Sequence, residues 1–507
     1  MKLKYIFLGL IISSGLLFTT SCSLDYDPID TYSDVTEGVN DAGKEAAFKD
    51  KAAVESHMQT IYNQLRERQE HWYMDLLLIA ESHADNAYAG TTGAEVVPFE
   101  NNAIEGSNSV IDRDWNRYLE DIARANKLIC NIDSVTDNTL SSAERERYRA
   151  EAKIFRAMVY FDMVRLWGDL PLIITEAGDI TSETIGEVYP EYFPSQSSEL
   201  EVYQQIEKDL LESLQYALDN NPADKTLFTK SVARILLAKV YAEKPLRDYS
   251  KVVQYCDALA GDGFDLVTDF SDIFGMNDDR TDAKMRNTKE SILEAQFFPG
   301  SGNWCTWMFG RDLVNWDNNF TWAKWVTPSR DLIKAFQNEG DNIRFNQSVV
   351  YYDCGWSNYY PADNYPFMYK CRSANSSIIK FRYADALLLK AEALIMRDNP
   401  DLSGAADIID QIRLRAGLSK LDSATKGSKE NMLNALLKER RLELAFEGQR
   451  WFDLVRLDKV EEVMNAVFAK DSGRKAQMYP FNQDSYRLPI PQAVIDQNPN
   501  LVQNPGY

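Results

Sequence analysis

The chain has 507 residues, of which 26% are charged, and its formal net charge at pH 7 is −22. This length allows one large domain or two to three ordinary ones. The acidic balance argues against nucleic acid as a partner, because a polyanion binds to a basic protein surface.

The N-terminus has the features of a secretory signal. Lys2 and Lys4 precede an apolar run from residue 6 to about residue 18, which is too short to cross a bilayer. Small residues then precede Cys22, as lipoprotein processing requires. We therefore predict that residues 1–21 are a lipoprotein signal peptide and that Cys22 carries the lipid anchor. The alternative is an ordinary signal peptide followed by an incidental cysteine.

The next segments alternate between loop and helix. Residues 84–109 contain several glycines and asparagines, which predicts a loop. Apolar residues from 152 to 164 recur at helical spacing, and this helix is expected to end near Trp167 because Pro171 follows closely.

Two later segments share one register, with matching residues 153 positions apart. Each reads as a helix, a polar turn with a proline (Pro245 or Pro400) and a second helix. This is the layout of a tetratricopeptide-type helix pair, and such pairs stack to bury a shared core. The alternative is chance similarity between two helical hairpins. The matched residues are Ala238, Tyr241, Val253, Cys256 and Leu259 with Ala391, Leu394, Ala406, Ile409 and Ile412.

Residues 271–376 are rich in Asn, Asp, Gly, Trp and Tyr, and five of the ten tryptophans lie between 304 and 325. A long irregular stretch in a compact protein is usually functional. Aromatic faces beside amides and carboxylates suit sugars, because a pyranose stacks its C–H face on a ring and hydrogen-bonds through its hydroxyls. Alternatively, most of these rings fix a long loop to the scaffold. We expect both, with one or two of the five rings at the ligand.

Carboxylates repeat every four residues at Glu439, Glu443 and Glu447. Arginines are interleaved with them and with Asp453, so we interpret the set as a structural charge network that ties two helices together rather than as a metal or acid–base site. The interleaved arginines are Arg440, Arg441, Arg450 and Arg456.

Signals for catalysis or metal binding are weak. The three histidines, His57, His71 and His83, lie in no HExxH pattern, and no nucleophile elbow or phosphate loop occurs. We therefore expect no enzymatic activity and no cofactor. The acidic loop at residues 277–282 is a candidate calcium site, but we favour a solvated turn. Cys354 and Cys371 are near enough in sequence to pair, but we expect reduced, buried cysteines.

Several stretches, in order along nearly the whole chain, resemble the SusD-like (RagB/SusD) family of outer-membrane nutrient-binding lipoproteins. Acidic residues directly after Cys22 resemble the surface-export signal of Bacteroidota lipoproteins. The other matching stretches are Asp114-Trp115 through Tyr118, Ile122, Ala125-Asn126 and Ile129; Glu151 to Pro171; Tyr383 to Ala393; Glu439 to Leu454; and, in the tail, Leu488 to Pro491, Asn498 to Leu501 and Gln503 to Tyr507.

The resemblance implies a mainly α, tetratricopeptide-like superhelix with an irregular, loop-rich subdomain. We assign residues 22–507 to a single domain of this SusD-like fold, with a helical scaffold at about 45–270 and 328–470. The loop-rich, ligand-facing segments are then 84–109 and 271–376. An extended tail, 488–507, holds four prolines and cannot form one continuous helix.

The resemblance also implies a function and a partner. Family members bind oligosaccharides, and some bind peptides, as the lid of a SusC-like TonB-dependent barrel in the outer membrane. The expected place is the extracellular face of that membrane. By position, the resemblance places ligand contacts at Trp316, Trp322, Asn319, Tyr88, Asn101 and Asn102. A tyrosine-rich stretch from Tyr351 to Tyr360 is a second candidate platform, or a surface for the barrel. A cell-surface glycosidase is the remote alternative.

Overall fold

The computed structural model describes residues 47–90, 93–136, 138–178, 182, 184–298, 302–304, 325–355 and 358–507. Four of the predicted functional residues, Cys22, Trp316, Asn319 and Trp322, lie outside these ranges. No helix in the described part of the chain combines the length and apolar character needed to cross a membrane.

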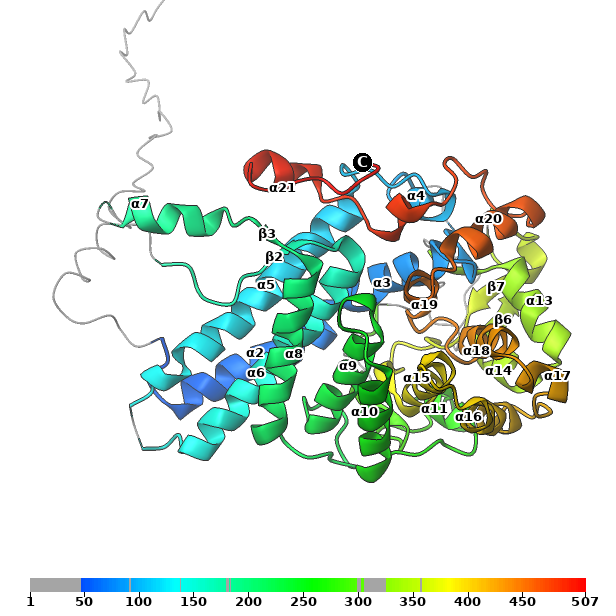
Figure 1. Cartoon of the computed structure of the whole chain (residues 1–507), viewed down its shortest axis with the longest axis horizontal. Helices are drawn as coiled ribbons and strands as arrows, with labels where there is room; N and C mark the ends of the chain where they lie inside the picture. Colours follow the sequence, from blue (N-terminus) through cyan, green and yellow to red (C-terminus); the bar gives the residue numbers. More distant parts are fainter. Residues whose placement is uncertain are drawn as a thin grey trace, which may run out of the picture.

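Long helices form the scaffold and pack one against the next, which confirms the predicted mainly α fold. In Figure 1 they lie side by side from α2, α5 and α6, through α9 and α10, to α15, α16 and α18. They are α2 (Lys51–Glu67), α5 (Ser109–Asn131), α6 (Ser142–Trp167), α8 (Glu199–Tyr216), α9 (Lys230–Ala242), α10 (Tyr249–Gly261), α15 (Tyr383–Met396), α16 (Leu402–Arg415) and α18 (Lys429–Glu443).

The two helix pairs predicted from the shared register are present as α9–α10 and α15–α16. Their turns are built alike. The amide of Asp248 donates to the carbonyl of Tyr241 at 2.8 Å, and the amide of Asp401 donates to the carbonyl of Leu394 at the same distance. Each aspartate also caps the helix that follows through its side chain. Because α10 packs on α15, the two pairs are consecutive units of one superhelix.

Shorter helices and turns connect and cover the scaffold. They are η1 (Glu70–Met74), α3 (Asp75–Leu77), η2 (Leu78–Ser82), α4 (Val97–Asn101), η3 (Ile132–Ser134), α7 (Ile185–Val188), η4 (Tyr189–Tyr192), η5 (Lys244–Leu246), α11 (Ser271–Phe274), α13 (Arg330–Glu339), α14 (Asn342–Ser348), η6 (Ala362–Asn364), α17 (Ser423–Lys426), α19 (Arg450–Arg456), α20 (Val460–Lys470), η7 (Gln483–Tyr486) and α21 (Gln492–Gln497). Of these, α13 and α14 lie where the predicted scaffold and loop-rich ranges overlap.

Strands within the described residues pair antiparallel, two by two. The pairs are β1 (Ala87–Tyr88) with β5 (Thr327–Pro328), β2 (Leu170–Pro171) with β3 (Gln196–Ser197), β4 (Ser291–Ala295) with β8 (Ile378–Arg382), and β6 (Val349–Tyr352) with β7 (Tyr365–Met368). Of these, β4–β8 fastens the irregular stretch to the segment that leads into α15, and β1–β5 joins the two loop-rich segments to each other.

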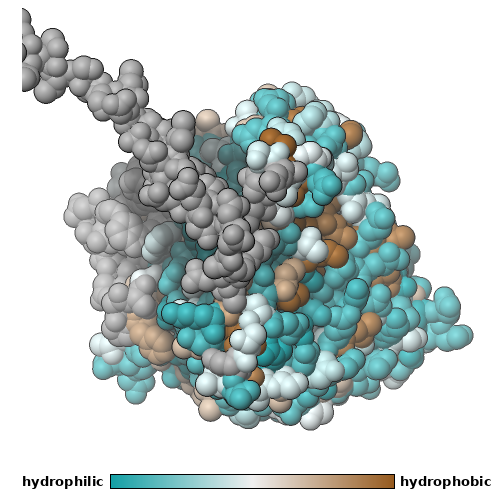
Figure 2. Space-filling model, turned by 90° about the vertical axis from the view of Figure 1, so that its left-hand side faces the viewer, coloured by the Kyte–Doolittle hydropathy of each residue, from teal (hydrophilic) through white to brown (hydrophobic). Residues whose placement is uncertain are grey.

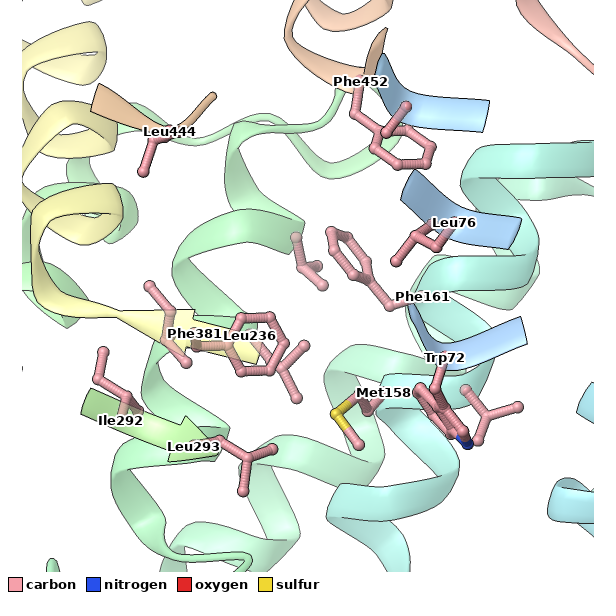
Figure 3. Close-up of a cluster of buried hydrophobic side chains, with 14 of the residues drawn as sticks. Trp72, Leu76, Met158, Phe161, Leu236, Ile292, Leu293, Phe381, Leu444 and Phe452 are labelled. Carbon is pink, nitrogen blue, oxygen red and sulfur yellow. The ribbon is translucent and has the colours of Figure 1, made fainter. Parts of the chain in front are cut away.

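One continuous hydrophobic core includes residues from Phe48 to Ile490. Figure 3 shows its centre, where Leu236 of α9 lies near Phe381 of β8, and Met158 of α6 lies near Trp72 of η1. The core therefore joins scaffold helices to the β4–β8 pair. The side of the molecule drawn in Figure 2 is mostly hydrophilic apart from smaller apolar patches, as the charged composition leads one to expect.

The C-terminal tail packs against the C-terminal end of α6. The amide of Leu488 donates to the carbonyl of Leu166 at 2.7 Å, and the indole N–H of Trp167 donates to the carbonyl of Pro489 at 3.1 Å. Gly168, with φ of 76°, ends α6 at the predicted place. Apart from the short α21, the tail has no helix, so the prediction that it forms no continuous helix is confirmed.

Among the described residues, Cys256 and Cys371 are buried and form no disulfide, and Cys354 is buried as well. The expectation of reduced, buried cysteines is confirmed for Cys256 and Cys371. Pairing of Cys354 with Cys371, the less favoured interpretation, is not what the structure shows.

Candidate functional site

The segment that carries the predicted tryptophans begins after Trp304 and ends before Trp325. At its start, the Trp304 amide donates to Gln69 Oε1 at 2.7 Å, and Gln69 Nε2 donates to the Gly302 carbonyl at 3.1 Å. At its end, Ser82 Oγ donates to the Trp325 carbonyl at 3.2 Å. Both ends are therefore held by one short stretch, residues 69–82, at the edge of the scaffold.

Tyr88 joins the two loop-rich segments to the residue that follows α20, and it is fully buried. Its ring stacks on Tyr359 with centroids 4.7 Å apart. Its hydroxyl donates to Asp471 Oδ2 at 2.7 Å and accepts from the Arg330 amide at 3.0 Å. Burial raises the pKa of Tyr88 to about 12. In this arrangement the residue positions its neighbours, and its contact with a ligand stays a prediction.

Asn101 and Asn102 end α4 and contact the segment before the tail. Asn102 has φ of 58°, a left-handed conformation that asparagine tolerates, and its Nδ2 donates to the Tyr479 carbonyl at 3.0 Å. The Asn101 carbonyl accepts from the Met478 amide at 2.9 Å. Glu100 links these residues to the Tyr88 region, because its Oε2 accepts from the Ala89 amide at 2.8 Å and from the Tyr359 hydroxyl.

Asn102 lines a surface groove of about 620 Å³, which we call the tail groove. The groove lies between residues 102–106, which follow α4, and the elements η7 and α21. In Figure 1, α4 and α21 lie along the same upper edge of the molecule. Two tyrosine rings stand at it, with Tyr479 62% exposed and Tyr507 42% exposed. Its other lining residues with polar side chains are Glu105, Asn482, Asp484, Ser485, Gln492 and Gln503.

The tail groove combines exposed aromatic rings with amides and carboxylates, which is the chemistry expected for neutral, hydroxyl-rich ligands. Sequence reasoning identified only Asn102 of this set. It missed Tyr479 and Tyr507 because they lie almost four hundred residues further along the chain. The one available signal was the similar chemistry of the 479–483 stretch, where tyrosine stands beside Asn482 and Gln483.

The predicted charge network is confirmed as structural. It is buried, and it joins more elements than the two helices that were predicted. Glu443 is fully buried and contacts three arginines: Arg382 Nη1 at 2.6 Å, Arg344 Nη1 at 3.1 Å and Arg415. Burial opposes ionisation of Glu443, yet the three guanidinium groups outweigh it and hold its pKa well below 4.5. The carboxylates are thus neutralised by cations and are not arranged for acid–base chemistry.

The interleaved arginines have other partners than Glu439, Glu443 and Glu447. Arg440 binds Asp453 and Asp385 at 2.8 Å, and Arg450 binds Asp85 at 2.7 Å. These contacts connect α18 and α19 to α15 and to the turn after η2. The sequence thus indicated the network correctly, but not which cation meets which carboxylate.

The acidic loop at 277–282 binds its own backbone. Asn277 Oδ1 accepts from the amides of Thr281 and Asp282, and Asp282 pairs with Arg286 at 2.6 Å. In the described part of the chain, no three His, Cys, Asp or Glu side chains are grouped so as to hold a metal ion. Two of the histidines form buried hydrogen bonds within the protein. His71 Nε2 lies 2.8 Å from Asp121 Oδ2, and His83 Nδ1 lies 2.7 Å from the carbonyl oxygen of Phe99.

Two family models match the chain. Residues 368–507 match the model described as "SusD family", and residues 39–242 match "Starch-binding associating with outer membrane". The SusD-like protein P2 of Formosa agariphila is 25% identical over 476 residues, which cover 85% of this chain and 87% of the relative. The starch-binding protein SusD of Bacteroides thetaiotaomicron is 25% identical over 452 residues, or 76% and 77% of the two chains.

A solved structure shares the fold. Surface glycan-binding protein A from Bacteroides thetaiotaomicron, in complex with laminarihexaose, superposes with a TM-score of 0.71 at 19% identity. The superposition covers 90% of this chain and 99% of the other. At this identity the likeness concerns the fold alone.

Proposed function

Because the chain belongs to the SusD-like family, we propose that it is a lipid-anchored binding protein of the outer cell surface that captures oligosaccharides. We propose further that it acts as the lid of a SusC-like TonB-dependent importer in the outer membrane. The protein is in this proposal a binder and not an enzyme.

The tail groove is the observation that carries the sugar assignment. Tyr479 and Tyr507 offer ring faces for stacking, while the exposed Glu105, Asp484 and Gln492 stand beside them with polar groups for hydroxyls. The starch-binding relative supports the same ligand class. The predicted contacts Trp316, Asn319 and Trp322, outside the described residues, add a second aromatic surface to the proposal.

Binding is expected to be measurable by isothermal titration of the protein without its signal peptide against a panel of neutral oligosaccharides and matched oligopeptides. Trp316→Ala, Trp322→Ala and Tyr479→Ala should each weaken binding of the preferred glycan about tenfold, since a lost stacking contact costs about 1–1.5 kcal/mol. Tyr216→Ala is the matched control, because Tyr216 is 50% exposed on α8, outside the tail groove.

Each outcome of the titration has a definite meaning. Binding of peptides without any glycan would replace the sugar by the alternative, an oligopeptide cargo for the same lid. Equal affinity of the wild type and all three aromatic variants would reject the proposed contacts. Release of shorter sugars during incubation would favour the remote alternative, a glycosidase.

The proposed anchor gives a separate prediction. Cys22→Ser should abolish lipidation, because only the thiol accepts the diacylglycerol, and the protein should leave the outer-membrane fraction. Fractionation and protease accessibility of whole cells measure both anchoring and surface exposure. Retention of the variant in the membrane fraction at the wild-type level would contradict the anchor and leave only the barrel partner to explain the location.

A further inference from the structure

A cavity of about 60 Å³ lies between the scaffold and the segment that leads into β8. Its walls come from η1 and α3, the ends of α6 and α9, β8, and residues 446–449. Four cationic side chains line it, each with no more than 9% of its surface exposed: Arg165, Lys239, Lys370 and Lys380. Among the cavity's lining residues, Glu447 is the one that carries a carboxylate.

Each lysine shares its carboxylate with an arginine. Asp162 binds Lys380 at 2.7 Å and also binds Arg165 at 2.5 Å. Asp385 binds Lys239 at 2.5 Å and Arg440 at 2.8 Å. At the third corner, Glu447 binds both Lys370 and Arg382. At each corner two cations share one carboxylate, and two of the arginines have a further carboxylate: Arg440 also pairs with Asp453, and Arg382 with Glu443.

The lysines also have more donors than the described residues use. An ammonium group carries three N–H donors. The described partners of Lys380 supply one acceptor, Asp162. Those of Lys239 supply two, Asp385 and Gln449, and those of Lys370 supply two, the Glu443 carbonyl and Glu447. The ammonium of Lys380 also lies 5.0 Å from the centre of the Trp72 ring, on the cavity wall.

A buried ammonium group is costly unless its N–H donors find acceptors, and each lysine here has fewer acceptors among the described residues than it has donors. Burial lowers the pKa of Lys239, Lys370 and Lys380, because it disfavours the charged form of each lysine. A negative group in the cavity would accept the remaining N–H donors and balance the charge. The cavity holds the equivalent of about two water molecules, which is room for a halide or a formate-sized carboxylate.

We propose that the cavity bounded by Arg165, Lys239, Lys370 and Lys380 is a binding site for a small monovalent anion. The anion would lie where scaffold helices meet β8, and so would fasten the loop-rich subdomain to the superhelix. This site is separate from the tail groove, and its existence does not depend on the proposed cargo.

Crystals of the wild-type protein soaked in sodium bromide test the site directly. The expected result is an anomalous bromide peak in the cavity, in contact with at least two of the lysine Nζ atoms. In solution, chloride or bromide should raise the Tm saturably by a few degrees over gluconate, which is too large to enter, at equal ionic strength. A cavity filled by water alone, or an equal Tm in halide and gluconate, would overturn the proposal.

Lys380→Met removes one cation from the proposed anion site. It leaves Asp162 with a partner, because Asp162 also pairs with Arg165. The variant should lose the saturable halide response, whereas Lys390→Met should retain it, since Lys390 pairs with Asp257 on the surface of α15. A halide response of the same size in both variants would contradict the cavity as its source. If Lys380→Met fails to fold, the bromide map of the wild type decides alone.

Discussion

Glu443→Gln is expected to lower the free energy of unfolding by about 3–5 kcal/mol, because it leaves buried arginines without their counter-charge. Glu443 is the carboxylate on which Arg344, Arg382 and Arg415 converge, and all four side chains are at least 95% buried. Glutamine keeps the shape but offers a single neutral acceptor. Chemical denaturation followed by tryptophan fluorescence measures the change.

The control for this variant is Glu462→Gln. Glu462 pairs with Lys459 on α20 and is 67% exposed, so the loss should stay below about 1 kcal/mol. Equal losses in the two variants would show that the buried network contributes no more than a surface pair. The pH dependence has a definite sign: since the folded-state pKa of Glu443 is depressed, its contribution is complete above about pH 4.5 and disappears as the pH falls towards the folded-state value.

Truncation after Arg487 is expected to have the second large effect, a loss of about 5 kcal/mol or more. The tail buries Leu488, Ile490 and Leu501, and each buried side chain of this size contributes about 1.5–3 kcal/mol. The indole N–H of Trp167 would also lose its acceptor inside the protein, at a cost of about 1–3 kcal/mol. Thermal unfolding and soluble yield measure the outcome.

Two point variants separate packing from simple chain length. Ile490→Ala should cost about 2–5 kcal/mol because the side chain is fully buried. Val502→Ala should be nearly neutral, since Val502 is 72% exposed in the same tail. An unchanged Tm after truncation would mean that the tail lies on the scaffold without stabilising it.

The helical architecture was predictable because its signals are local. The register shared by Ala238 and Ala391 depends on spacing within single helices, and Pro171 marks a helix end by its own geometry. The same holds for the tail, where prolines exclude a continuous helix. Such features need no knowledge of which segments meet.

The candidate site depends on contacts between distant segments, and these were only partly predictable. Asn102 was identified by position, but its neighbour Tyr479 comes from the far end of the chain. Likewise, the arginines near Glu443 in the sequence form ion pairs with Asp385, Asp453 and Asp85. The cations that contact Glu443 include Arg344 and Arg382, which belong to other elements. Residue spacing gives the number of charges on a helix, but only the fold selects their partners.

The anchoring of the tryptophan-bearing segment by Gln69 and Ser82 has a consequence for evolution. Both ends are fixed at one short base, so the span between them closes a loop whose entropic cost grows by only about 0.6 kcal/mol for each doubling of length. Insertions and substitutions between residues 304 and 325 are therefore cheap for the scaffold. If this segment contacts the ligand as proposed, its exchange changes the ligand that is bound and leaves the rest of the protein unchanged.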